Sequence, residues 1–182
     1  MRSMGANVLS MGGLSRKVTL VTIDDERVHL RRATADDAGT IAALNEHVHR
    51  LHVEALPAQF LTVDRTAAEA FFSAQLADEG NIVWIAELGG EPVGYLYAVE
   101  AHRGVNPFTT EQHTLYIHHL AVDPAVRRRG VGSAMIATAE TYARAHGLSG
   151  LRLDSWLFNT EAHAFFRGLG FEPSITRFAR DL

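Results

Sequence analysis

The segment from Arg127 to Ser133, which reads Arg-Arg-Arg-Gly-Val-Gly-Ser, has residue types that suit the binding of phosphate groups. Gly130 and Gly132 carry no side chain, so backbone N–H groups at the start of a following helix can approach a ligand closely. The helix dipole favours negative charge at that end, and the arginines can add charge-assisted hydrogen bonds to phosphate oxygens. The segment therefore predicts a diphosphate-binding turn, with a solvated basic turn before an ordinary helix as the alternative.

Two widespread phosphate-binding motifs do not match this segment. A P-loop requires Gly-Lys followed by Ser or Thr, and no such triplet follows Gly132. A dinucleotide fingerprint requires a third glycine at the position that Met135 occupies. The basic turn is therefore expected to hold a phosphorylated ligand of another kind.

Two adjacent histidines, His118 and His119, lie in a β-rich stretch that leads into this turn. The ordinary pKa of histidine suits it to accept a proton near neutral pH. Strict alternation places His118 on the face shared by Tyr116, Leu120 and Val122, and His119 on the other face, unless a bulge alters the facing. His118 is the first candidate for a base or proton relay and His119 the second. The alternative is a histidine packed and hydrogen-bonded in a half-buried sheet.

Composition narrows the class of protein. The 182 residues suffice for one good core, so one domain is expected, and 47% apolar with 21% charged residues is ordinary for a globular protein. The net charge of -4 argues against a general nucleic-acid binder. The chain has no cysteine, which excludes disulfides, thiolate metal sites and cysteine nucleophiles.

Membrane and metal sites are not expected either. No stretch approaches 18 apolar residues, and residues 1–14 have no apolar run typical of a signal peptide, so we expect a cytoplasmic protein. The chain has ten histidines, but His47 and His49 are two apart on an expected helix and point to different faces. The sequence therefore predicts no metal site.

Periodicity and turn residues predict the elements that position these groups. Ile41, Leu44 and Val48 recur at helical spacing, Asp64 can cap a second helix, and Gly89-Gly90 separates two β-rich runs as in a hairpin. The expected elements are an edge strand at 18–23, a strand at 28–31, helices around 41–51 and 66–76, strands at 82–86, 93–99 and 114–122, a helix from Gly132 to Gly147, a strand at 151–157, a helix from Asn159 to Arg167 and a strand at 175–178.

Three motifs in this order resemble the GCN5-related N-acetyltransferase (GNAT) family. The family signature, Gln/Arg-x-x-Gly-x-Gly/Ala after a strand ending in Val-x-Pro, is similar to Arg127–Gly132 with Val122-Asp123-Pro124 ahead of it. The stretch Val28–Ala38 resembles the family's first strand and helix entry more weakly. A further family element is matched by Asn159, Ala162, Phe165, Phe166, Gly170 and Phe171. Together the three motifs span residues 27 to 180.

The resemblance implies a single-domain α/β acyl-CoA N-acyltransferase fold. Its mixed, mostly antiparallel sheet splays at strand four, counted from Val28, and is flanked by about four helices. The acyl-pantetheine arm of acetyl-CoA lies in the gap like an added strand, and a backbone N–H there stabilises the developing oxyanion. The implied cofactor-binding residues are Leu120, Ala121, Val122, Arg127, Arg128, Arg129, Gly130, Val131, Gly132, Ser133, Asn159 and Phe166. For Asn159 a plain helix cap is an equal alternative.

The resemblance also implies direct transfer of an acetyl group from acetyl-CoA to a primary amine of a small molecule or protein. His118 matches a position from which some family members present a histidine to the acceptor. Phe166 departs from the pattern, because many members carry a tyrosine there that protonates the leaving thiolate. A thiol with a pKa near 8.5 can leave as the thiolate without that acid. Two rival functions are a non-catalytic acyl-CoA-binding regulatory module and an RNA- or partner-binding domain that uses Arg127–Arg129.

The acceptor is left open among a lysine side chain, a protein N-terminus, a polyamine, an amino acid and an aminoglycoside. By family analogy its site lies between the first two helices and the later strands. Candidates to line this region are His47, His49, His52, Glu54, Phe60, Phe108, Trp156 and Phe158. Residues 1–26 are expected to form an N-terminal extension and residues 27–182 the N-acetyltransferase domain, and a homodimer is compatible with the resemblance.

Overall fold

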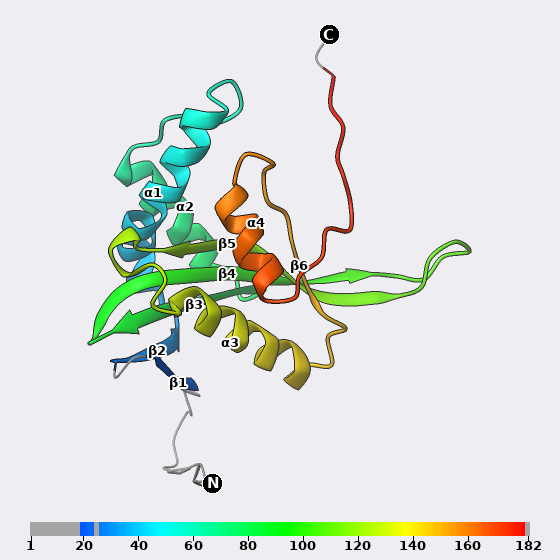
Figure 1. Ribbon diagram of the computed structural model, residues 1–182, viewed down its shortest axis with the longest axis horizontal. Coiled ribbons are helices and arrows are strands. Elements are labelled where there is room, and N and C mark those ends of the chain that lie inside the picture. The colour runs from blue at the N-terminus through cyan, green and yellow to red at the C-terminus, as the bar shows by residue number, and fades with distance from the viewer. Residues whose placement is uncertain (1–18, 24–25, 181–182) are drawn as a thin grey trace, which may run out of the picture.

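In the part of the chain that the structure describes, six strands form one sheet, and strands that follow one another in the chain also lie side by side, from β1 to β6. The computed structural model (Figure 1) describes residues 19–23 and 26–180. The elements are β1 (Thr19–Ile23), β2 (Glu26–Arg32), a 3-10 turn (Ala35–Asp37), α1 (Ala38–Ala55), α2 (Arg65–Ala77), β3 (Asn81–Leu88), β4 (Glu91–Arg103), β5 (Gln112–Val122), a 3-10 turn (Pro124–Val126), α3 (Val131–Ala145), β6 (Leu151–Leu153) and α4 (Thr160–Gly168). Only β5 and β6 pair in parallel, so the described sheet is mixed and mostly antiparallel, which confirms the predicted fold class.

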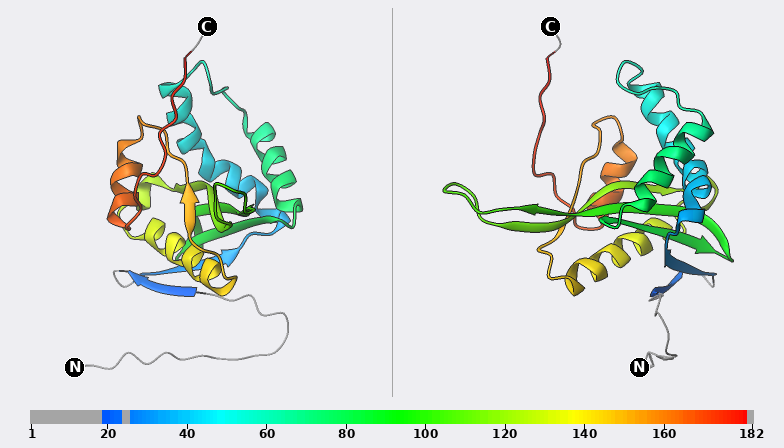
Figure 2. Two further views of the ribbon diagram at one scale, coloured as in Figure 1. Left: turned by 90° about the vertical axis from the view of Figure 1, so that its right-hand side faces the viewer. Right: turned by 180° about the vertical axis from the view of Figure 1, so that it is seen from behind.

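The helices lie on both faces of the sheet. Helices α1 and α2 cover one face and α3 covers the other, while β4 and β5 continue past the other strands as a long hairpin (Figures 1 and 2). Under α3 the largest fully buried side chains include Leu96, Leu115 and Met135. Under α1 and α2 the core includes Ile41 and Tyr95, both 0% exposed. The two cores fix the helices that border the candidate site.

Local sequence signals account for several element ends. The side chain of Asp64 accepts a hydrogen bond from the Ala67 N–H at 2.7 Å and so caps α2, as predicted. Gly89 and Gly90 have φ values of 62° and 90°, which the two-residue β3–β4 turn requires. Gly147 has a φ of 69° just after α3, as expected for a glycine that ends a helix.

One half-buried arginine, Arg31, joins β2 to the start of α1. The Arg31 guanidinium donates to both carboxylate oxygens of Asp37, at 2.8 and 2.7 Å, and to Glu87 on β3 at 2.6 Å. The hydrogen bond from Arg31 holds the pKa of Asp37 below its ordinary value. This network fixes the point at which α1 leaves the sheet.

Two expectations about strands differ from the structure. The predicted strand at 175–178 is absent from the described chain, where Ile175 and Phe178 are 88% and 91% exposed. The strand predicted at 151–157 is shorter, Leu151–Leu153, because β5 diverges from it after Ile117 and leaves later residues without a partner. This short β6 also offers too little edge for a further strand. The expected edge strand is confirmed as Thr19–Ile23, whereas residues 1–18 lie outside the described chain and the domain boundary stays a prediction.

Candidate active site

Strands β5 and β6 diverge and leave part of β5 with one neighbour. They pair only through Leu115–Leu151, Tyr116–Arg152 and Ile117–Leu153. From His119 to Val122, β5 pairs with β4 alone. The described sheet therefore splays at the predicted strand, and the last part of β5 has a backbone edge that is free for a ligand.

A β-bulge at His118 marks the point of divergence. Ala98 of β4 lies opposite Ile117 and Tyr97 lies opposite His119, so His118 is an extra residue on β5. A bulge of this kind inverts the direction in which later backbone groups point. The pairing between β5 and β6 thus ends at the position of the bulge.

The bulge decides which backbone groups reach the free edge. Before it, the Leu115 N–H donates to Gly150 O on the β6 side. After it, the Asp123 N–H donates to Val93 O on the β4 side, at 2.8 Å. Because backbone groups alternate in direction along a strand, those of Ala121 face β4 and those of Leu120 and Val122 face the free edge.

The bulge also corrects the predicted facing of the two histidines. The rings of His118 and His119 both contact Tyr97, with centroid distances of 5.1 and 5.5 Å. Leu120 and Val122 instead pack against the core under α3. The expectations that His118 shares a face with Leu120 and Val122 and that His119 lies opposite His118 were therefore wrong, because strict alternation ends at the bulge.

His118 is the more accessible histidine of the pair. Its ring lies 4.9 Å from that of Tyr116 and its side chain is exposed. Partial burial lowers its pKa, and the negative charge of Asp154 opposes that shift. His118 is therefore mostly neutral at pH 7 and able to accept a proton.

His119 belongs to a hydrogen-bonded chain that runs into the core under α1. The Tyr95 hydroxyl donates to Asn45 Oδ1 at 2.8 Å and lies 3.0 Å from His119 Nδ1. Since the hydroxyl proton points to Asn45, Nδ1 of His119 carries its own proton and donates to Tyr95. The lone pair of His119 therefore resides on Nε2, on the far side of the ring from Tyr95.

Burial of His119 keeps this imidazole neutral. Desolvation, with smaller contributions from nearby His118, His52 and His49, lowers the pKa of His119 to about 4. Burial also raises the pKa of Tyr95 well above its ordinary value. The Asn45–Tyr95–His119 chain is thus uncharged at neutral pH.

The basic turn stands at the start of α3, next to the free edge. Gly130 is the N-cap residue with a φ of 78°, and Arg128 also has a positive φ, of 62°. The first α-helical hydrogen bond runs from the Ala134 N–H to Gly130 O, so the N–H groups of Val131 to Ser133 have no acceptor within the helix. These donors suit an anion, and the predicted binding of a diphosphate there stays a prediction.

The glycine at position 132 leaves room for a neighbouring side chain as well as for a ligand. A Cβ at this position would lie 2.9 Å from Cζ of Phe165 on α4. Phe166 packs on Phe165 and Phe171, with centroid distances of 5.2 and 5.5 Å. The aromatic pair therefore anchors α4 against the start of α3.

Other predicted cofactor residues have structural contacts. The Asn159 side chain accepts from the Ala162 N–H at 3.2 Å and so caps α4; its contact with a cofactor stays a prediction. Arg127 forms a solvent-exposed ion pair with Glu161 at 3.5 Å. Such a pair is weak and leaves Arg127 able to turn to a phosphate. Arg127, Arg128 and Arg129 are all exposed.

Part of the predicted acceptor region comes together as a group of rings. His52 lies 5.0 Å from Phe60 and 5.5 Å from Phe158, and Phe60 lies 5.5 Å from Trp156. We call His52, Phe60, Trp156 and Phe158 the ring wall. His49 joins its margin, 6.4 Å from Phe60.

Three other candidates do not belong to the ring wall. Phe108 is 94% exposed in the β4–β5 hairpin loop. Glu54 pairs with Arg50 at 3.8 Å. Burial and the charge of Arg127 lower the pKa of His47, which places it toward the basic turn.

Four residues of the site carried no sequence signal that singled them out. Asn45 and Tyr95 are 50 residues apart, and each fits an ordinary helix or strand pattern. Tyr97 reads as a core strand residue. Burial, together with the hydrogen bond that Tyr116 donates to Asp154, raises the pKa of the Tyr116 hydroxyl to about 12. Only the three-dimensional pairing brings these groups to the histidines.

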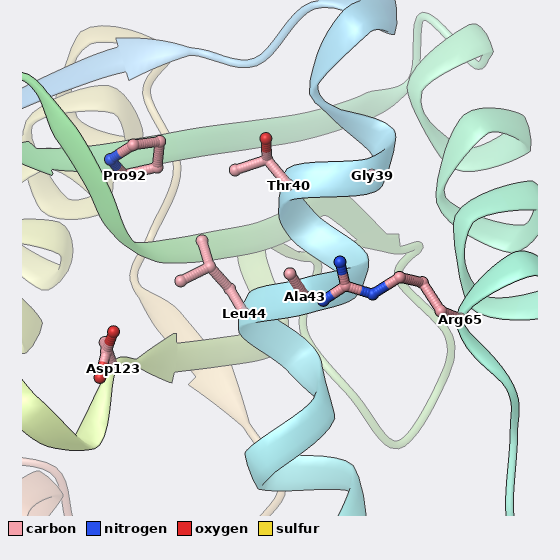
Figure 3. Close-up of a pocket in the computed structure, with 7 residues that line it drawn as sticks. All are labelled: Gly39, Thr40, Ala43, Leu44, Arg65, Pro92 and Asp123. Atoms are coloured by element: carbon pink, nitrogen blue, oxygen red, sulfur yellow. The ribbon is translucent and has the colours of Figure 1, made fainter.

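Two surface hollows lie beside α1. One of about 470 Å³ is lined by Gly39, Thr40, Ala43, Leu44, Arg65, Pro92 and Asp123 (Figure 3). The other, of about 560 Å³, lies between the start of α1 and α2. Neither lining includes the histidines or the free edge, so the candidate site is defined by the splayed strands and not by these hollows.

Within the described ranges, the structure groups no three histidine, aspartate or glutamate side chains as a metal site. In the same part of the chain, every helix is too short or too polar to cross a membrane.

The comparisons with known proteins agree with the fold and motifs. The profile of the acetyltransferase (GNAT) family matches residues 45–171, which is more than half of the chain. The protein therefore belongs to the GNAT family and is an N-acetyltransferase. Enzymes of this family use acetyl-CoA.

Relatives and solved structures are similar over different lengths. The uncharacterised N-acetyltransferase YhfO of Bacillus subtilis is 27% identical over 80% of this chain and 90% of its own length. Human N-acetyltransferase 8 is 31% identical over 54% of this chain, and the matched segment covers only 42% of the length of that relative. The BH1408 protein of Bacillus halodurans, solved as a tetramutant, has a TM-score of 0.79 and 26% identity over 84% of this chain and 99% of its own. The aminoglycoside N-acetyltransferase AAC(6')-Iy, solved with CoA, has a TM-score of 0.68 and 20% identity over 88% of this chain and 99% of its own, a likeness of fold alone.

Proposed function

We propose that the protein transfers the acetyl group of acetyl-CoA directly to a primary amine. The amine nitrogen attacks the thioester carbon, a C–N bond forms, the C–S bond breaks, and CoA leaves as the thiolate while the amine loses a proton. The observation that carries this proposal is the free edge of β5 beside the unpaired N–H groups at the start of α3. A pantetheine arm and its diphosphate need these two features in this order.

The cofactor contacts follow from the direction of the backbone groups. Leu120 and Val122 offer N–H and C=O groups to the pantetheine and the thioester carbonyl, with Ala121 between them as a strand residue. The N–H groups from Arg129 to Ser133 hold the diphosphate, and Arg127 and Arg128 contact it from the rim. Phe166 on α4 and Asn159, the N-cap residue of α4, contact the cofactor beside this path.

His118 is the proposed proton acceptor. An alkyl ammonium with a pKa near 10 must lose its proton before it attacks, at a cost on the order of 4 kcal/mol at pH 7. A neutral imidazole at the splay lowers that barrier as a base or through a water relay. His119 is the second candidate, because its hydrogen-bonded chain keeps Nε2 unprotonated.

No side chain is needed to protonate the leaving group. Phe166 has no proton to donate, and Tyr116 already donates its hydroxyl proton to Asp154. The CoA thiolate is a stable leaving group on its own near neutral pH. The proton therefore comes to the thiolate from solvent after it departs.

Incubation with acetyl-CoA and a panel of amines tests this function, with free thiol and the N-acetylated product as readouts. We expect thiol release that depends on the amine. A rise in melting temperature with CoA but no turnover of any amine would favour the regulatory module. Stabilisation by RNA and not by CoA would favour the partner-binding alternative.

A further inference from the structure

The ring wall joins three segments that are distant in sequence. His52 lies on the last turns of α1, Phe60 in the linker before α2, and Trp156 and Phe158 in the segment that follows β6. The rings meet edge to face or tilted, with centroid distances of 5.0 to 5.5 Å. They form a continuous aromatic surface, which is a common recognition surface for flat apolar groups.

This surface lies outside both cores of the described chain. Trp156 and Phe158 remain 42% and 38% exposed, and neighbouring Leu157 and Leu61 are 80% and 81% exposed. Exposed apolar side chains that gather in one place mark binding sites more often than scattered ones do. The partial exposure of Trp156 and Phe158 leaves ring area for a ligand.

The ring wall borders the site of the proposed chemistry. Trp156 and Phe158 lie three and five residues beyond the end of β6, where the sheet opens. His49 and His52 lie about one and two turns along α1 from Asn45, which is linked through the Tyr95 hydroxyl to His119. A molecule on the ring wall would therefore reach toward the two histidines and the free edge.

The charges around the site suit one ammonium group and not several. Asp154 acts on His118 and accepts a hydrogen bond from Tyr116, so it can attract a cation to the histidines. Three further carboxylates on α1 and α4 are each paired with an arginine at 3.5 to 3.8 Å: Glu46 with Arg65, Glu54 with Arg50, and Glu161 with Arg127. These arginines offset part of the negative charge, so the three carboxylates attract a polycation less than unpaired carboxylates would.

We propose that the acceptor is a primary amine with a single positive charge and an aromatic group. The aromatic group lies against Phe60, Trp156 and Phe158, and the amine nitrogen lies near His118 and Asp154. This inference rests on the proposed acetyl transfer and adds the class of acceptor. It differs from the expectation that the aminoglycoside acetyltransferases of similar fold would suggest.

Acetylation of matched amines tests the acceptor class. The panel contains 2-phenylethylamine, n-butylamine, spermidine and an aminoglycoside, and kcat/KM is measured by thiol release. We expect 2-phenylethylamine to be preferred over butylamine and over spermidine by about tenfold or more, from the ring contacts. Equal or higher kcat/KM for spermidine or the aminoglycoside would overturn the inference.

Variants of Trp156 test whether the preference for an aromatic amine arises at the ring wall. Trp156→Ala should raise KM for 2-phenylethylamine by about tenfold and leave KM for acetyl-CoA unchanged, while Trp156→Phe should restore most of the preference. Phe108→Ala, on the distant hairpin, is the matched control and should change neither constant. A Trp156→Ala enzyme that keeps the wild-type preference would contradict the proposed position of the aromatic group.

Binding measurements separate this inference from the proposed function. Calorimetric titration of 2-phenylethylamine into the CoA-loaded protein reports on the ring wall without turnover. Binding that Trp156→Ala weakens, with no acetylation of any amine, would refute the transferase function and support the aromatic site. Acetylation of amines without selective binding of the aromatic one would refute the aromatic site alone.

Discussion

At the scale of single residues, the bulge at His118 gives two neighbouring imidazoles different environments. His118 is exposed beside Asp154, whereas His119 is held by Tyr95 and Asn45. An exposed imidazole can reach an acceptor and exchange protons with water. A hydrogen-bonded, desolvated imidazole is better suited to hold a fixed orientation.

Replacement of His118 tests whether this histidine, and not His119, accepts the proton. His118→Ala should lower kcat by about a hundredfold with little change in KM for acetyl-CoA. Because the pKa of His118 lies below its ordinary value, the wild-type kcat at saturating amine should fall only as pH drops below about 6.5, and this acid limb of kcat should vanish in the variant. His102→Ala, in the β4–β5 hairpin, is the control. A His118→Ala rate within twofold of wild type would assign the base elsewhere.

The pKa of His119 predicts how stability depends on pH. The folded-state pKa of about 4 lies below the unfolded value, so between these values the unfolded chain binds more protons than the folded one. Stability should therefore be full above about pH 6.5 and fall by about 2–3 kcal/mol as pH drops to 4. Urea unfolding at several pH values measures this slope, which His119→Gln should reduce. An unchanged slope in that variant would show that His119 titrates normally.

At the scale of elements, the start of α3 depends on its contact with α4. Gly132 lies where Phe165 packs, and any Cβ there would lie 2.9 Å from the Phe165 ring. The same residue contributes an N–H group to the proposed diphosphate site. Cofactor binding and helix packing are thus coupled at one position.

Gly132→Ala should weaken both the binding of CoA and the packing of α3 against α4. We expect about 1–3 kcal/mol lower unfolding free energy from overpacking and a tenfold or greater loss of CoA affinity. Calorimetry with CoA and chemical unfolding measure the two effects. Gly104→Ala is a matched control, because a Cβ there meets no atom within 4 Å. Wild-type CoA affinity in Gly132→Ala would refute the proposed close approach of the diphosphate.

At the scale of the whole molecule, features that depend on adjacent residues were predicted better from the sequence than features that depend on the pairing of distant segments. The caps, the glycine turns and the position of the basic turn before α3 depend on a few adjacent residues and were predicted correctly, whereas the binding of a diphosphate at that turn stays a prediction. The facing of His119 depends on the register between β4 and β5, and the Tyr95–Asn45 contact depends on how α1 packs on the sheet. The sequence contains no local mark of either. The strand expected at 175–178 had suitable residue types but no long edge to pair with.

The splayed sheet predicts how CoA should change hydrogen exchange across the protein. If the pantetheine arm pairs with the free edge, the amides of Leu120 and Val122 should exchange more slowly in the CoA complex, because the ligand gives them acceptors. The amide of Ala121 faces β4 and should be protected with or without CoA, so it serves as an internal control. Exchange measured by NMR distinguishes these adjacent amides. Equal protection of all three in the free protein, or slower exchange confined to Ala121, would show that the cofactor does not complete the sheet at this edge.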